Sequence, residues 1–252
     1  MAEQPVDAGP GGVGGIPHAG KIQQRGQRVG PGGTGRGARS AGTDGKTHDD
    51  DGTRRSPAAR TALAYAAPAM ARPLTLLLVR HGQSEWNATG RMQGQTPHVP
   101  LTPLGHAQAE AAAAELTGLG PGALISSDLV RAVQTADHCA RATGLAVVTT
   151  PALREQGYGE LEGRPSRELW DVVDWTDPHW SATGGESLAE LHGRVEAFLK
   201  NLSTEPPADV IALVTHGDTI RAAQAVVAGL GPDAMPAVTP HNGSVTRLEL
   251  IA

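Results

Sequence analysis

The chain has 252 residues and a formal net charge of −5 that is unevenly distributed: residues 1–70 carry nine Lys/Arg against six Asp/Glu (+3), and residues 71–252 carry twelve against twenty (−8). An acidic domain of this kind is a poor partner for nucleic acid, so any anion that it binds must be held by a local cluster of cations. The single cysteine, Cys139, excludes an internal disulfide and a multi-cysteine zinc site, and no apolar run approaches the roughly 20 residues of a membrane span.

Residues 1–72 are expected to form a disordered, Gly/Pro-rich extension. Gly, Pro, Arg, Ser and Asp dominate this stretch, so it cannot bury enough apolar surface to offset the entropy lost on folding. We interpret a position near Met70 as the true start and the preceding residues as an over-extended reading frame. A twin-arginine export signal at Arg54-Arg55 is the alternative, although its apolar part is short and lies far from the first residue. The folded domain is then expected to span residues 73–252.

From residue 74 onward, the apolar pattern alternates between short strands and longer helices. The unbroken apolar run at 74–79 is typical of a buried strand. Thr102 and Pro103 are the expected cap and first residue of a helix, which Gly118 and the glycines at 120–122 are expected to end. The further elements, in chain order, are a strand at 123–126, a helix ending near 143 with Gly144 as its stop, a strand at 146–149, a helix at 188–202, a strand at 210–214, a helix ending near 230 and a closing strand at 244–251.

Side chains suited to phosphate chemistry stand at the ends of three predicted strands. The first strand ends in Arg80-His81-Gly82 and the strand at 210–214 ends in Thr215-His216-Gly217, while Arg131 follows the strand at 123–126. The carboxyl ends of parallel strands lie at one edge of a sheet, where open α/β proteins bind their ligands. Arginine offers a planar fork of donors to phosphate, and a glycine here would let the backbone approach the ligand closely. The sequence therefore predicts an anion site that these strand ends share.

Two segments between residues 150 and 184 lack any regular period. Residues 153–163 carry Glu155, Glu160 and Glu162 among three glycines. Residues 164–183 hold three of the four tryptophans, and one interpretation places their rings in the core. Our preferred interpretation is a mobile cap over a ligand pocket, because the tryptophans are irregularly spaced and a proline interrupts the segment.

Together these blocks resemble the histidine phosphatase superfamily, also called phosphoglycerate-mutase-like, and in particular its small phosphatase branch. The resemblance covers roughly residues 74–250 in the family's order. It implies an α/β fold, a three-layer sandwich in which a mostly parallel central sheet is flanked by helices. The matching blocks are Arg80-His81-Gly82 with Glu85 and Asn87, Leu101-Thr102-Pro103-Leu104-Gly105, Ser126-Ser127-Asp128-Leu129 with Arg131, Gly184-Gly185-Glu186-Ser187 and Thr215-His216-Gly217.

The resemblance also implies a two-step phosphoryl transfer that needs neither a metal nor a cofactor. His81 would be the nucleophile and form a phosphohistidine. Arg80, Arg131 and His216 would surround the transferred group with positive charge. Glu155 would give a proton to the leaving alcohol and later take one from water.

Other residues are expected to bind the substrate or orient the nucleophile. The substrate-binding positions are Asn87, Gln93, Gly94 and Gly217. The carbonyl of Gly82 is the expected acceptor for the second ring nitrogen of the nucleophile.

The short passage between Glu155 and Gly184 departs from the glycolytic mutases and is closer to the small phosphatases. We therefore expect a cytoplasmic, metal-independent phosphomonoesterase that acts on a small organic phosphate, such as a sugar phosphate or a phosphoglycerate-type metabolite. A cofactor-dependent phosphoglycerate mutase and a non-catalytic phosphate-binding relative are the alternatives. The expected partner is this small phosphate ester, and we expect no binding to nucleic acid or to a membrane. The sequence leaves open which phosphate ester is the physiological substrate and whether the chain forms a homodimer.

Overall fold

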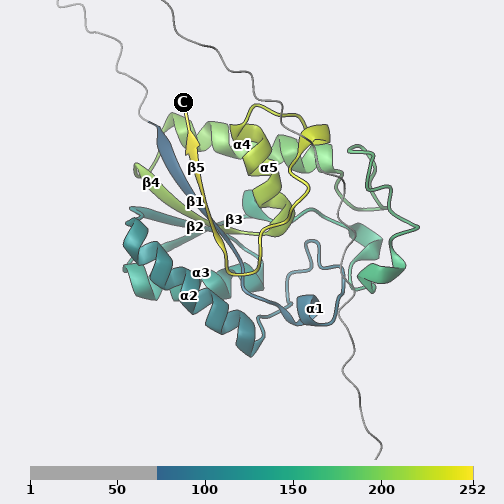
Figure 1. Cartoon of the computed structure of the whole chain (residues 1–252), viewed down its shortest axis with the longest axis horizontal. Coiled ribbons are helices and arrows are strands. Elements are labelled where there is room, and N and C mark those ends of the chain that lie inside the picture. Colours follow the sequence, from purple (N-terminus) through teal and green to yellow (C-terminus); the bar gives the residue numbers. More distant parts are fainter. Residues whose placement is uncertain (1–72, 252) are drawn as a thin grey trace, which may run out of the picture. The chain divides into compact units, whose positions relative to one another are not determined.

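A computed structural model of the chain describes residues 73–251 (Figure 1). The expectations for residues 1–72, including a start near Met70, lie outside these described residues. Within the described part, no helix combines the length and the apolar character that a membrane crossing requires.

A five-stranded sheet forms the centre of the described part, in the order β3-β2-β4-β1-β5. The first four strands run parallel and β5 pairs antiparallel to β1, so the sheet is mostly parallel as the sequence predicts. The strands are β1 (Leu74–Arg80), β2 (Ala123–Ser127), β3 (Val147–Thr150), β4 (Val210–Thr215) and β5 (Val245–Leu250).

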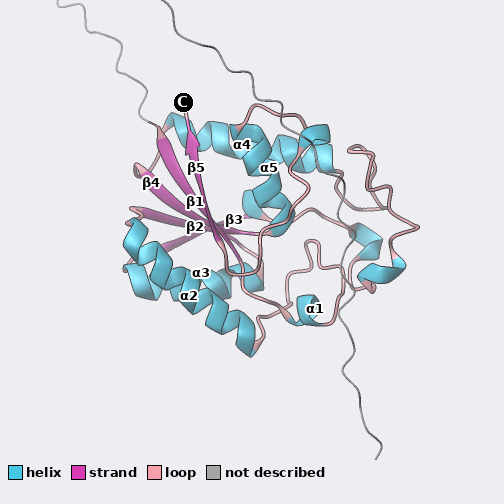
Figure 2. Cartoon of the chain, in the orientation of Figure 1, coloured by secondary structure: helices cyan, strands magenta, loops and turns pink. Residues whose placement is uncertain are grey.

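Helices cover both faces of the sheet and complete the three layers that were expected. Figure 2 shows α2 and α3 on one side of the strands and α4 and α5 on the other. The α-helices are α1 (Glu85–Ala88), α2 (Pro103–Leu119), α3 (Val130–Thr143), α4 (Leu188–Thr204) and α5 (Gly217–Val227), and short 3₁₀ turns lie at Pro151–Leu153, Gly159–Leu161, Ser166–Glu168 and Pro232–Ala234.

The continuous apolar run of β1 follows from its burial between these two helical layers. Leu76 and Leu78 pack into the core cluster that α4 and α5 share, whereas Leu77 and Val79 pack into the cluster of α2 and α3. Each is at most 1% exposed, so each contributes about 1.5–3 kcal/mol by burial. The strand is therefore a rigid support for the residues that follow it.

The predicted helix ends are right in most places and wrong at two. Thr102 caps α2 by accepting the N–H of Gly105 at 3.0 Å, and Gly144 ends α3, both as expected. Gly118, however, does not end α2. The helix continues to Leu119 and stops at Gly120, whose φ of 64° closes it. Helix α5 ends at Val227 rather than near residue 230.

Candidate active site

The structure brings the two His-Gly strand ends together. Strands β1 and β4 are paired with Arg80 opposite Thr215, so His81 and His216 leave the sheet side by side. Their ring centroids lie 5.0 Å apart with the planes inclined by 62°. Arg131, in the first turn of α3 after β2, completes the group. The prediction that these strand ends share one edge of the sheet is therefore confirmed.

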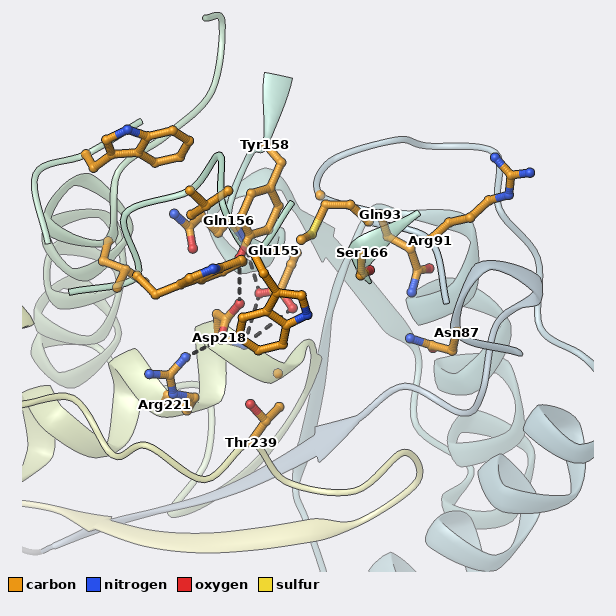
Figure 3. A pocket seen from close by; sticks show the side chains of 18 of the residues that line it. Asn87, Arg91, Gln93, Glu155, Gln156, Tyr158, Ser166, Asp218, Arg221 and Thr239 are labelled. Atoms are coloured by element: carbon orange, nitrogen blue, oxygen red, sulfur yellow. Dashed lines mark hydrogen bonds and ion pairs between the residues drawn. The ribbon is translucent and has the colours of Figure 1, made fainter. Parts of the chain in front are cut away.

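A pocket of about 590 Å³ opens at this edge (Figure 3). Of the nine predicted site residues, eight line the pocket: Arg80, His81, Asn87, Gln93, Gly94, Arg131, Glu155 and Gly217. His216 is not among the lining residues; its ring is fully buried and lies against the ring of His81. One pocket thus collects residues from β1, α1, α3, α5 and the loops between them.

The ring of His81 is held in a single orientation. Its Nδ1 lies 2.7 Å from the carbonyl oxygen of Gly82, the acceptor expected from the sequence. A carbonyl can only accept, so Nδ1 carries the ring proton and Nε2 keeps its lone pair. Burial lowers the pKa of His81 well below its usual value, and the charges of Arg131 and Arg80 lower it further. The imidazole is therefore neutral, as a nitrogen nucleophile must be.

His216 is held from the other side. Its Nε2 lies 2.8 Å from the hydroxyl of Ser127, while its Nδ1 is buried without a hydrogen-bond partner among the described residues. Burial, followed by the charge of Arg131, lowers the pKa of His216 well below its usual value. The lowered pKa favours the neutral ring, which offers a hydrogen bond. A positive charge on His216 beside a bound phosphate stays a prediction.

The two arginines supply the positive charge of the site. Arg131 is 1% exposed and donates to the carbonyls of Thr96 (3.0 Å) and Gly94 (2.7 Å). Burial lowers the pKa of Arg131 to about 10, so it stays protonated at neutral pH. Arg80 donates to the carbonyl of Pro240.

Three buried donors of this cluster have no partner within residues 73–251, namely Arg80 Nε, Arg131 Nε and His216 Nδ1. Leaving a buried donor unpaired costs roughly 1–3 kcal/mol, and more for a charged group. Such groups are retained where a ligand completes their hydrogen bonds. These donors therefore mark a site for an anion.

The amides of Asn87 and Gln93 are oriented through Ser84, which caps α1. Asn87 Oδ1 lies 3.1 Å from the backbone nitrogen of Ser84 and 3.3 Å from Asn242 Nδ2. Gln93 Oε1 accepts the hydroxyl of Ser84 at 2.6 Å. Because both amide oxygens are engaged, the NH₂ groups are available as donors to the pocket, as the sequence-based expectation requires.

The side chain of Glu155 lies against the first turn of α5. Its Oε1 accepts the backbone N–H groups of Asp218 (3.1 Å) and Thr219 (3.2 Å). Burial, and then the carboxylate of Asp218, raise the pKa of Glu155. A carboxyl group that keeps its proton in this way can act as a general acid.

The neighbouring glutamates have other roles. Glu162 accepts from Thr96 Oγ1 at 2.6 Å and from the N–H groups of Gln95 and Tyr158 at 2.8 and 3.1 Å. Glu162 therefore connects the loop after Gly94 to the segment that carries Glu155. Glu160 is exposed and does not line the pocket.

The tryptophans divide between the two interpretations of their segment. Trp170, Trp175 and Trp180 all line the pocket. Trp170 and Trp175 are 69% and 42% exposed, with ring centroids 5.7 Å apart. Trp180 packs instead on a small core cluster that includes Leu161 and Leu169. Trp170 and Trp175 are thus exposed at the pocket, as the interpretation as a cap expects. The mobility of this segment stays a prediction.

Gly82 lies against the start of α2. A Cβ atom at this position would lie 2.1 Å from the carbonyl oxygen of Gly105, and one at Gly105 would lie 2.0 Å from the carbonyl oxygen of Gln83. Gly82 therefore permits a close approach to the backbone of α2, while a close approach to the ligand stays a prediction.

Several contributors escaped sequence reasoning. Ser127 holds His216, and Asn242 donates to the carbonyl of His81 at 3.0 Å. Tyr158 and Asp218 line the pocket beside Glu155. Asp218, which directly follows a His-Gly strand end, and Ser127, which ends β2, carried a usable signal.

The comparisons with known proteins agree with this geometry. A family model described as the histidine phosphatase superfamily (branch 1) matches residues 76–252. Relatives named probable phosphoglycerate mutase GpmB from Yersinia enterocolitica and Proteus mirabilis are 37% and 36% identical, over 70% of this chain and 85% of theirs. The solved mycobacterial glucosyl-3-phosphoglycerate phosphatase in complex with VO3 is 33% identical with a TM-score of 0.64, covering 69% of this chain and 92% of that one.

Proposed function

Because the chain belongs to the histidine phosphatase superfamily and is an enzyme of that class, we propose that it hydrolyses the monophosphate ester of a small organic molecule through a phosphohistidine at His81. One observation carries the proposal: a neutral imidazole with a free Nε2 lone pair lines a pocket beside three buried, unpartnered donors. The donors suit the oxygens of a phosphoryl group, and the imidazole suits its phosphorus atom.

In the first step, Nε2 of His81 attacks phosphorus in line with the leaving oxygen. The N–P bond forms as the P–O bond to the substrate alcohol breaks, and Glu155 gives its proton to that oxygen. Arg80 and Arg131 neutralise charge on the equatorial oxygens, the role that metal ions have in many phosphoryl-transfer enzymes. The N–H of His216 completes the hydrogen bonds to the group.

In the second step, water attacks the phosphohistidine. The carboxylate that Glu155 now presents takes a proton from this water, and the new P–O bond replaces the N–P bond. Inorganic phosphate leaves, His81 is neutral again and Glu155 has recovered its proton. The two steps therefore return the enzyme to its starting state.

The outer pocket supports a sugar-bearing substrate, such as a sugar phosphate or a phosphoglycerate-type metabolite. The exposed rings of Trp170 and Trp175 offer apolar faces on which the CH groups of a sugar ring can pack. Arg91, on the same pocket, can bind a second anionic group such as a carboxylate. The mycobacterial neighbour is a phosphatase of glucosyl-3-phosphoglycerate, which has both features.

The test is a panel of phosphate monoesters assayed for phosphate release with EDTA present. At least one sugar phosphate or phosphoglycerate derivative should be hydrolysed, and His81→Asn should abolish its turnover. Loss of activity on chelation, or undiminished turnover by His81→Asn, would contradict the proposal.

The names of the curated relatives favour phosphoglycerate mutase as a second candidate. In that reaction a hydroxyl of phosphoglycerate, and not water, would receive the phosphoryl group from His81, and the resulting bisphosphoglycerate would return its other phosphoryl group to His81. Supplying the purified chain with 3-phosphoglycerate and a trace of 2,3-bisphosphoglycerate to phosphorylate His81 separates the two activities: the phosphatase releases inorganic phosphate, whereas the mutase forms 2-phosphoglycerate. Interconversion faster than phosphate release would favour the mutase.

A further inference from the structure

We propose that Asp218 is a positioning residue for proton donation: its carboxylate, held by Arg221 and Tyr158, keeps the transferable proton on Glu155. The inference rests on the proposed function, since it concerns how the general acid of that reaction retains its proton. Figure 3 shows these four side chains together on one side of the pocket, with Asn87 on the other.

The two oxygens of Glu155 are not equivalent. Oε1 accepts the N–H groups of Gln156 (3.2 Å), Asp218 (3.1 Å) and Thr219 (3.2 Å), together with the hydroxyl of Thr219 (3.3 Å). Oε2 has only a contact of 3.3 Å with the N–H of Asp218. Oε1 is therefore the anchored oxygen, and Oε2 is the one that can carry a proton to the substrate.

Most of the surroundings favour the ionised form of Glu155. Two of the N–H groups that bind Oε1, those of Asp218 and Thr219, belong to the first turn of α5, where the helix dipole stabilises a negative charge. Arg80 and Arg131 act in the same direction by their charges. These contacts lower the pKa of Glu155 and so work against proton donation.

Asp218 has the opposite effect and favours the protonated form of Glu155. Its Oδ1 forms an ion pair of 2.6 Å with Arg221 Nη1, and its Oδ2 accepts the hydroxyl of Tyr158 at 3.2 Å. Both contacts stabilise the negative charge on Asp218. Two neighbouring carboxyl groups do not ionise equally when only one has a cation of its own, so the proton goes to the other. The pKa of Glu155 is raised accordingly, by burial first and by Asp218 second.

The other charged groups nearby do not change which of the two carboxyl groups keeps the proton. Arg194 on α4 donates to the carbonyl of Glu155 (3.2 Å) but is ion-paired with Glu186 at 2.7 Å. The titratable and charged side chains that act on the two carboxyl groups are Arg80 on β1, Arg131 on α3, Tyr158 and Arg221 on α5.

The test is the pH dependence of kcat/KM for Asp218→Asn, measured between pH 5 and pH 9 with an alkyl phosphate. Asparagine retains the shape of the side chain but not its charge, so Glu155 should lose its proton at lower pH. The alkaline limb of the profile should shift to lower pH by about one unit, which corresponds to roughly a tenfold loss of kcat/KM at a given pH on that limb. The rates should converge with those of the unaltered chain near pH 5. Titration of the substrate phosphate is the same for both proteins and cancels in the comparison.

Two controls identify the cause. Nitrophenyl phosphate has a leaving group that hardly needs an acid, so its profile should stay unchanged in Asp218→Asn. Asp171→Asn removes the same charge from an exposed position that does not line the pocket, and should leave both profiles unchanged. Tyr158→Phe, which removes one support of the Asp218 charge, should shift the alkyl phosphate profile in the same direction by a smaller amount.

An unshifted alkaline limb in Asp218→Asn would overturn the inference, as would an equal loss for both substrates at every pH. Glu155→Gln distinguishes this failure from that of the proposed function. If Glu155→Gln is impaired on the alkyl phosphate while the limb of Asp218→Asn is unshifted, only the inference fails. If Glu155→Gln turns over the alkyl phosphate normally, the proposed acid fails and the inference fails with it.

Discussion

At the scale of single residues, proton donation can be separated from phosphate binding through Glu155. Glu155→Gln should lower kcat/KM for an alkyl phosphate by about 10²–10⁴-fold, the usual contribution of a general acid. It should change kcat/KM for nitrophenyl phosphate much less, because kcat/KM reports the first step and nitrophenolate leaves without a proton. Steady-state kinetics on the two substrates measures both effects, and Glu160→Gln, at an exposed position outside the pocket, is the matched control. Equal losses on the two substrates would count against a donor role.

Sequence reasoning located the residues that follow strand ends, because strand direction alone brings such residues to one edge of the sheet. Arg80, His81 and Arg131 were found in this way. Ser127 ends β2 and stands in a matching block, but sequence reasoning assigned it no role. Asn242 was not found, since its contact with His81 depends on how a loop distant in the sequence folds. The neutral state of His216 also required the structure, because it follows from burial beside arginines.

At the scale of elements, the packing of α2 against the end of β1 depends on the mutual approach of Gly82 and Gly105. Gly82→Ala should lower the free energy of unfolding by about 1–3 kcal/mol or more, because its Cβ would lie 2.1 Å from a backbone oxygen that cannot rotate away. Gly118→Ala is the matched control. A Cβ at this helical position meets nothing within 4 Å and should stabilise α2 by up to about 1 kcal/mol.

Urea unfolding of both variants measures these differences. A Gly82→Ala protein as stable as the unaltered chain would show that the close approach has no energetic importance. The same variant should also lose activity, since Gly82 positions the ring of His81 through its carbonyl.

The boundaries of elements were predictable where a cap has a specific geometry. Thr102 and Gly144 have such geometries, and the structure confirms them. Gly118 was misjudged as a stop because a glycine disfavours a helix by only about 1 kcal/mol, which packing overcomes. The left-handed conformation that ends α2 belongs to Gly120. The position of Trp180 in a core cluster depends on tertiary contacts that irregular spacing does not reveal.

At the scale of the whole molecule, His81 and His216 link folding stability to pH. The pKa of each lies well below 6.5 in the folded chain. Below that pH, the unfolded chain binds protons that the folded chain cannot, so stability is fully present above pH 6.5 and falls as the pH decreases. Each histidine contributes a slope of about 1.4 kcal/mol per pH unit.

Denaturant unfolding at pH 5 to 7 should therefore show a shallower decline for the double variant His81→Asn/His216→Asn than for the unaltered chain, by up to about 2.7 kcal/mol per pH unit. Glu155 acts with the opposite sign, because its raised pKa gives stability that is lost as the pH rises, but it is present in both proteins. Identical slopes in the two proteins would contradict the neutral, buried state of the rings.

The central claim is that His81 carries the phosphoryl group between substrate and water. Rapid mixing with a substrate, quenching under denaturing conditions that preserve phosphohistidine and peptide mass spectrometry measure this directly. The account predicts an acid-labile, base-stable phosphate on His81 that forms before steady state and is absent from His81→Asn. A phosphate on any other residue, or turnover of the same substrate with no phosphoenzyme at any time after mixing, would contradict it.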